Sequence, residues 1–428
     1  MMDHTALLAV GIFVITYAFI VSEWVHRAII SMVGAALVIL LGIVDQDMAI
    51  HHIDFNTLGL LIGMMVLVNI TAQTGVFSYL AIWTAKKARG EPILILVAVA
   101  VVTAVVSAFL DNVTTVLLMV PVTFNVTQRL GISPYPYLMA QILASNIGGT
   151  ATLIGDPPNI MIGSANPNLT FLDFINNLGI VSAIILVVTI GLMALIFRRS
   201  LDASAERKET LMTLEEKTEI TNPVLLKKSL SVLALTIFGF FLHQKLHLDS
   251  ATIALSGAFV LLLLTDEKQV ERALAKVEWT TIFFFTGLFV IIAGLVETGV
   301  IETLARAALE LTGGRLNATV MLILWMSALV SAFLDNIPFV ATMIPMVQEM
   351  GHMGLTNLDP LWWSLSLGAC LGGNGTLIGA SANLIVAGLA DKEGHRISFV
   401  QYLILGFPLM ILSIAISAAY VYLRYLIH

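Results

Sequence analysis

The sequence predicts an all-α polytopic membrane protein with two inverted-topology repeats, about ten transmembrane helices, two re-entrant helical hairpins and broken helices at the midplane. Three observations support this prediction. The 428 residues are 58% hydrophobic and 11% charged, whereas soluble domains are about 45–50% apolar and roughly 25% charged. Several apolar runs are long enough to cross a bilayer. The second half of the chain also repeats motifs of the first half at a constant offset.

The composition excludes several classes of protein. A net charge of −7 leaves no basic surface for a phosphate backbone, so we expect no nucleic-acid partner. The single cysteine, Cys370, excludes a disulfide framework and a metal site built from thiolates. The sequence has no Walker A, HExxH or GxSxG motif. We therefore expect a membrane protein that is not an enzyme and has no cofactor and no bound metal.

Apolar runs of about 20 residues mark the expected spans, because a bilayer core about 30 Å thick needs a helix of that length. They lie near 5–22, 28–44, 55–72, 139–162 and 172–196, and then near 229–245, 250–265, 279–297, 361–388 and 400–423. The first run lacks the basic start of a cleaved signal peptide, so it is expected to remain as a span. The polar stretch 198–228 is expected to be a linker between a first repeat, 1–197, and a second repeat, 229–428.

The internal repeat has a fixed register. Residues 107–112, SAFLDN, recur unchanged at 331–336, an offset of 224, and the same offset carries Gly148-Gly149 onto Gly372-Gly373. Each half has five expected spans, and an odd number turns the second copy upside down relative to the first. Placing the linker in the cytoplasm puts 17 of the 21 basic residues, including Arg27, on that side. We therefore expect a multi-pass inner-membrane protein with both termini non-cytoplasmic.

Two further apolar stretches, near 92–128 and 316–348, are interrupted at their centres by Asp111-Asn112 and Asp335-Asn336. An ionisable side chain within a membrane segment is costly and marks function by default. We interpret each stretch as a re-entrant hairpin with the Asp-Asn pair at its tip. Two full spans joined by a tight polar turn are the alternative, because either reading leaves an odd number of spans in each half.

Glycine and proline residues interrupt the expected spans at 139–162 and 361–388. They predict non-helical backbone over 148–158 and 372–382, which exposes free amide and carbonyl groups to a cavity. The second copy lacks the two prolines and the acid that matches Asp156, so the site is expected to be asymmetric. The candidate substrate- or ion-binding residues are Asp111, Asn112, Thr114, Thr115, Asn146, Gly148, Gly149, Thr150, Asp156, Asn159, Asp335, Asn336, Gly372, Gly373, Asn374, Thr376, Ser381 and Asn383.

The motifs SAFLDNVTT at 107–115 and NIGGTATLIGDPPN at 146–159 resemble the ion transporter superfamily, and most closely its ArsB/NhaD and P-protein branch. The resemblance implies that the hairpins and broken helices form a mobile transport domain beside a scaffold. Sodium-coupled dicarboxylate relatives carry Ser-Asn-Thr at the hairpin tips. Here the tips read Asp111-Asn112-Val113 and Asp335-Asn336-Ile337, which places a titratable carboxylate where the ion would sit.

The resemblance favours an arsenite or antimonite exporter that works by proton antiport, with Asp111 and Asp335 binding the exchanging protons. It also implies lipid, a homodimer and a soluble ATPase subunit as partners. A sodium/proton antiporter is the first alternative, and an ion-coupled transporter of a small anion or carboxylate is the second. An intramembrane aspartyl protease is disfavoured, because those enzymes resemble Gly-x-Gly-Asp and both tip aspartates here follow Phe-Leu.

Overall fold

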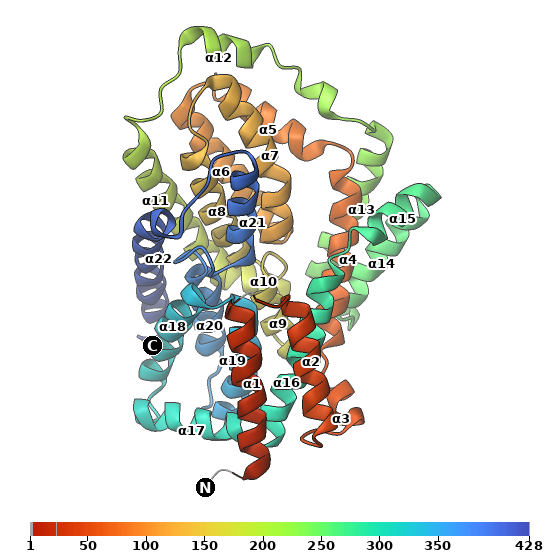
Figure 1. Cartoon of the computed structure of the whole chain (residues 1–428), viewed down its shortest axis with the longest axis vertical. Coiled ribbons are helices and arrows are strands. Elements are labelled where there is room, and N and C mark those ends of the chain that lie inside the picture. Colours follow the sequence, from red (N-terminus) through yellow and green to blue (C-terminus); the bar gives the residue numbers. More distant parts are fainter. Residues whose placement is uncertain (1–2, 23, 428) are drawn as a thin grey trace.

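The computed structural model describes residues 3–22 and 24–427, and within those ranges it is helical and contains no strand (Figure 1). The first half comprises α1 (His4–Ser22), α2 (Arg27–Leu40), α3 (Gln46–His51), α4 (Phe55–Ala72), α5 (Val76–Lys87), α6 (Pro92–Phe109), α7 (Asn112–Leu130), α8 (Tyr135–Thr150), α9 (Pro157–Ala165), α10 (Phe171–Phe174) and α11 (Ile180–Phe197). The second half comprises α13 (Pro223–Leu246), α14 (Ser250–Leu263), α15 (Glu267–Ala275), α16 (Trp279–Glu297), α17 (Val300–Thr312), α18 (Leu316–Phe333), α19 (Asn336–His352), α20 (Asp359–Gly372), α21 (Ser381–Lys392) and α22 (Phe399–Val421). Between them the linker forms α12 (Ala205–Met212) and a short 3₁₀ turn, Glu216–Glu219.

The helices confirm the internal repeat. Six pairs begin 224 residues apart, from α4 and α16 at Phe55 and Trp279 to α9 and α21 at Pro157 and Ser381. The copies have opposite directions in space, since α5–α7 lie in the upper half of Figure 1 and α17–α19 in the lower half. The repeats also exchange partners: α2 packs along α16, and α14 packs along α4. The predicted fold class is therefore confirmed.

Eight helical segments in the described chain are long and apolar enough to cross a bilayer by length and composition. They include both first arms of the hairpins, α6 and α18, while α2 and α14 are shorter apolar helices of 14 residues each. Large apolar side chains are exposed along α1, α11, α13 and α22, for example Val187, Leu235 and Ile404. A protein in water would bury such side chains, whereas hydrocarbon accepts them, so the chain is a multi-pass membrane protein.

The two Asp-Asn segments are hairpin tips inside the molecule. Asp111 and Asn112 from the first tip line the same small cavity as Asn336 from the second tip. Tips of full spans would emerge on opposite faces, separated by the bilayer core of about 30 Å. Because the tips meet, α6–α7 and α18–α19 are re-entrant hairpins that enter from opposite ends.

The helix breaks are shorter than the sequence pattern predicts. The helix α8 continues to Thr150, so Gly148 and Gly149 are helical, and α9 begins at Pro157. The break itself spans only 151–156 in the first repeat and 373–380 in the second. The prediction of non-helical backbone over 148–158 and 372–382 is therefore wrong at both ends. Proline is favoured in the first turn of a helix, where its missing N–H has no intrahelical partner, so Pro157 starts α9 rather than disrupting it.

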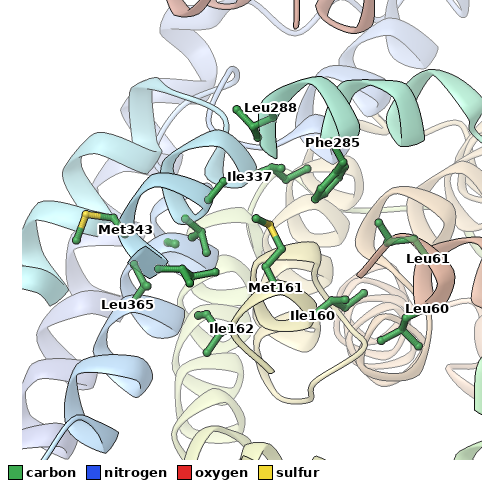
Figure 2. Packing of buried hydrophobic residues seen from close by; sticks show 14 of the residues in the cluster. Leu60, Leu61, Ile160, Met161, Ile162, Phe285, Leu288, Ile337, Met343 and Leu365 are labelled. Atoms are coloured by element: carbon green, nitrogen blue, oxygen red, sulfur yellow. The ribbon is translucent and has the colours of Figure 1, made fainter. Parts of the chain in front are cut away.

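Buried apolar side chains enclose the breaks. Figure 2 shows Ile160, Met161 and Ile162 of α9 among residues of α4, α16, α19 and α20. Phe285 and Leu365 in this cluster are fully buried. This packing excludes water and lowers the local dielectric constant, which strengthens every polar interaction at the breaks.

The linker is anchored to the upper ends of the first-repeat helices in Figure 1. The ammonium of Lys86 at the end of α5 lies 2.7 Å from a carboxylate oxygen of Glu216, and that of Lys208 lies 2.9 Å from Glu91. Arg207 donates a hydrogen bond to the carbonyl of Leu130 at the end of α7. The segment 198–228 is thus partly helical and docked, and its last residues belong to α13.

Candidate functional site

The site is built where the two hairpin tips meet the two helix breaks. Asp111 precedes α7 and accepts a hydrogen bond from the backbone N–H of Thr114 at 2.8 Å. Asp335 precedes α19 and accepts one from the N–H of Ile337 at 3.2 Å. Both aspartates therefore cap the helix that follows, the structural role that aspartate commonly plays at helix N-termini.

Asp335 also belongs to an ion pair. The guanidinium of Arg27 lies 3.1 Å from Oδ2 of Asp335 and donates a second hydrogen bond to the Ser381 hydroxyl at 2.8 Å. The Ser381 hydroxyl in turn donates to Asp335, and the ring of Phe284 lies 5.2 Å from Cζ of Arg27. The sequence count of basic residues assigns Arg27 to the cytoplasmic side together with the loop cations. Arg27 begins α2 and reaches the tip of the second hairpin.

Four asparagines join the two repeats. Nδ2 of Asn112 donates to Oδ1 of Asn146, and Nδ2 of Asn146 lies 2.9 and 3.0 Å from the side-chain oxygens of Asn374 and Asn383. All four side chains are buried. The network connects the first hairpin and α8 with the second break, so the candidate amides do converge at one place.

Asn159 and Asn383 stabilise the breaks. Nδ2 of Asn159 donates to the carbonyls of Thr150 and Thr152, at 3.1 and 2.8 Å. Its counterpart Asn383 donates to the carbonyls of Gly373 and Thr376, at 2.7 and 2.9 Å. These side chains replace the intrahelical donors that unwinding removes, which satisfies carbonyls in a region that lacks water.

Hydroxyl groups and glycines hold each hairpin against its broken helix. Ser107 donates to the carbonyl of Ser145 at 2.7 Å, and its repeat partner Ser331 donates to that of Ala369 at 2.6 Å. Thr376 donates to the carbonyl of Ala332. A methyl group at Gly148 would lie 2.1 Å from a backbone oxygen of α6, and one at Gly372 would lie 2.6 Å from the matching oxygen of α18. The paired glycines thus permit close packing rather than unwinding.

Asp156 differs from the other two aspartates. Its side chain is 1% exposed, Oδ1 accepts a 3.4 Å hydrogen bond from Nδ2 of Asn336, and Oδ2 has no partner among the described residues. No aspartate occupies the equivalent position in the second repeat, where the residue is Ala380. The predicted asymmetry of the site is therefore present in the side chains of the two breaks.

Two cavities adjoin these groups. The first, of about 30 Å³, is lined by both hairpin tips, Arg27, Asp156 and Glu278. The second, of about 310 Å³, is lined by His26, Arg27, Asp335, Ser381 and apolar side chains. A cavity that holds one water needs about 10–15 Å³, so the first suits a water or a small ion. Only the second has the size of a small-molecule pocket.

Most of the candidate residues lie around the hairpin tips and the helix breaks, where they form different contacts. Thr150 donates its hydroxyl hydrogen to the Asn146 carbonyl, whereas the buried Thr115 hydroxyl has no partner in the described chain. Sequence reasoning missed Arg27 and Glu278. A weak signal exists for Glu278, because its repeat counterpart Asp54 also precedes a helix and accepts a hydrogen bond from a threonine three residues later.

Inverted repeats that meet at broken helices and polar hairpin tips define a secondary membrane transporter. The chain belongs to the citrate transporter family CitMHS, whose profile matches residues 17–368. It is 44% identical to an uncharacterized transporter of Mycobacterium tuberculosis over 99% of both chains. It is 35% identical to the human P protein, over 98% of this chain and 60% of that protein.

A solved structure shows the same fold. The YdaH transporter of Alcanivorax borkumensis aligns with a TM-score of 0.61 and 14% identity over 99% of both chains. The YdaH transporter has an unusual topology. The superfamily and the P-protein relationship that the sequence motifs predict are confirmed, and the chain is a membrane transporter.

Proposed function

We propose that this chain is a proton-coupled transporter of a small carboxylate anion and that the anion and the proton move together. The observation that carries the proposal is the ion pair of Arg27 and Asp335 beside the larger cavity. A guanidinium presents several donors in a planar fork that matches a carboxylate, which makes it a suitable first contact for such a substrate. The family description, citrate transporter, supports the same substrate class.

The geometry supports coupling by exchange of partners. The side chain of Arg27 is 30% exposed and that of Asp335 is 15% exposed, so a ligand in the cavity can reach the guanidinium. A substrate carboxylate that takes the guanidinium leaves Asp335 without its counter-charge in a poorly hydrated place. Asp335 then binds a proton, because desolvation disfavours the charged form of a carboxyl group. Substrate and proton therefore bind in the same state, as symport requires.

Arsenite or antimonite export, the leading prediction from the sequence, gains no support from the site or from the family match. Arsenite at neutral pH is an uncharged trihydroxide and needs no guanidinium. The amide network suits a neutral ligand, but its donors and acceptors largely bond one another across the two repeats. Transport of an anion, by contrast, gives the positive charge of Arg27 at the cavity a role in substrate binding.

The test compares substrates in membrane vesicles that contain the full chain. Uptake of radiolabelled citrate, arsenite and sodium is measured with and without an imposed pH gradient. We expect saturable citrate uptake that acid on the substrate side stimulates. Stimulated movement of arsenite or sodium without citrate uptake would contradict the proposal.

Arg27→Gln tests the substrate contact directly. It should raise the KM for citrate at least about thirtyfold, because truncating one partner of a desolvated charge pair costs about 2–5 kcal/mol. Arg306→Gln is the matched control, since Arg306 forms an exposed pair with Glu302 on α17. An unchanged KM in the Arg27 variant would remove the guanidinium from substrate binding.

A further inference from the structure

Asp156 sits where a helix cap is expected, yet its side chain forms no capping hydrogen bond. It immediately precedes α9, whose first two residues are Pro157 and Pro158. A capping side chain accepts a hydrogen bond from the N–H of the second or third helical residue. Pro158, at the second position, has no N–H, and the N–H of Asn159, at the third, bonds the backbone carbonyl of Asp156. No described residue gives its side chain a capping hydrogen bond. Helix capping, which explains the positions of Asp111 and Asp335, therefore does not explain Asp156.

The surroundings of Asp156 suit a protonated carboxylic acid. The side chain is 1% exposed, and its single hydrogen bond in the described chain comes from the neutral amide of Asn336. A buried carboxylate without charged or multiple hydrogen-bond partners is strongly destabilised relative to its neutral form. The neutral acid removes that penalty and gives the second oxygen a hydrogen.

The charged neighbours favour the same form. Arg27 from α2, Asp111 from the first hairpin tip and Glu278 before α16 line the same cavity, and Arg27 is already engaged by Asp335. The buried Cys370 thiol lies on α20, in the opposite repeat. The cavity is thus lined by more acidic than basic side chains. In the described chain no three His, Cys, Asp or Glu side chains converge to hold a metal ion. These surroundings suit a proton as the group that neutralises Asp156.

We propose that Asp156 is a second proton-binding residue of the transport cycle, distinct from Asp335. The inference rests on the proposed proton-coupled function. Asn336 belongs to the tip of the second hairpin, so a movement of that tip away from the break removes the one hydrogen bond of Asp156. The cavity of about 30 Å³ beside it then opens toward water, and Asp156 releases its proton. Each chain has one such group, because the other break carries Ala380.

The first test counts protons. In proteoliposomes with the membrane potential held at zero, each co-transported proton supports about tenfold accumulation of citrate per pH unit, since a tenfold ratio corresponds to about 1.4 kcal/mol. Wild-type protein should approach the slope for two protons. Asp156→Asn, which keeps the shape but cannot titrate, should lose one proton and fall to about tenfold per pH unit. An unchanged slope would overturn the proposal.

Asp249→Asn is the control for this count. Asp249 also precedes a helix, α14, without a capping side-chain hydrogen bond to a described residue, but it is exposed. Its variant should keep the wild-type slope. A loss of slope in both variants would show a general effect of removing an acid and would overturn the assignment.

The second test does not depend on citrate transport. The infrared spectrum of the purified wild-type protein in lipid at neutral pH should contain the carbonyl band of a buried, protonated carboxylic acid. That band should be missing from Asp156→Asn and present in Asp249→Asn. If wild-type protein fails to take up citrate but keeps the band, the proposed function fails and the protonation of Asp156 stands. If the band is absent from the wild type, Asp156 is charged and the inference fails.

Discussion

Asp111 and Asp335 occupy equivalent positions in the two repeats and cap equivalent helices, but only Asp335 contacts Arg27. Asparagine is nearly isosteric with aspartate and is itself a good cap, yet it cannot bind a transported proton. Asp335→Asn should therefore keep citrate exchange and lose the stimulation of net uptake by a pH gradient. Counterflow and gradient-driven uptake of citrate, measured in the same proteoliposomes, separate the two activities.

Asp111→Asn is the matched comparison, because it changes the same atoms at the other tip. The sequence predicts that both aspartates bind transported protons. The contacts in the structure favour Asp335 for this role. Gradient-driven uptake should fall much less in Asp111→Asn than in Asp335→Asn. Equal losses would return the coupling role to both residues, and wild-type uptake in both variants would remove them from the mechanism.

The functional role of a single residue was predictable where the local sequence of one repeat already marks the residue as unusual. Asn146 and Asn159 stand beside Gly and Pro in an apolar run, and such polar groups are expected at a membrane site. Arg27 carries no such sign, because it stands at the start of an apolar run where loop cations are common. Its partner Asp335 lies 308 residues away in the chain. Only the packing of α2 against the second repeat brings them together.

The packing of α8 against α6 makes a prediction at the scale of the helix. A methyl group at Gly148 would lie 2.1 Å from the backbone oxygen of Ala104, which cannot move as a side chain can. Gly148→Ala should therefore lower stability by about 1–3 kcal/mol. In α11, a methyl group at Gly191 meets no described heavy atom within 4 Å, so Gly191→Ala should be neutral or slightly stabilising. Thermal unfolding in detergent, followed for both variants, checks the difference.

The docked linker makes a second prediction, about pH. A hydrogen bond from the Lys86 ammonium lowers the pKa of Glu216. The docked state therefore gains its contribution from this carboxylate above the ordinary pKa of glutamate, and loses it as pH falls through the lowered value. A spin label at Thr218→Cys should become more mobile as the pH falls through that range. With Lys86→Met added, the label should be mobile throughout, and a pH response that persists there would exclude the ion pair as its cause.

Helix boundaries at the breaks show the limit of sequence patterns. Glycine and proline predict an interruption in each broken helix, and each interruption is present at 151–156 and 373–380. The ends of each interruption were not predictable, because Gly148 lies within α8 and serves helix packing, and Pro157 starts α9. Both roles depend on a neighbouring backbone that the local sequence does not describe.

At the scale of the molecule, the inverted repeat fixes which ends share a face. In Figure 1 the start of α1 and the last described residues after α22 lie in the lower half, while α12 of the linker lies at the top. The positive-inside rule predicts that the linker is cytoplasmic. A reporter fused after His428 should therefore be non-cytoplasmic, and one inserted near Glu209 should be cytoplasmic. Reporters on the same face would contradict this topology.

The fold was predictable because the repeat supplies two independent copies of each signal. Apolar length gave the spans, and the constant offset gave the hairpins and breaks of both copies. The proposed substrate class was not predictable in this way, since the proposal depends on which charged side chain reaches the cavity between the copies. Arg27 supplies that charge from a helix outside the matching motifs.

The direction of proton movement tests the central claim most directly. Citrate is added to unbuffered proteoliposomes that contain the wild-type protein, with the membrane potential held at zero and the external pH recorded. The proposed symport predicts that the external medium becomes more alkaline as protons enter with the anion, and that Arg27→Gln greatly slows this change. Acidification of the medium on addition of citrate, or a pH change driven by arsenite but not by citrate, would contradict the account.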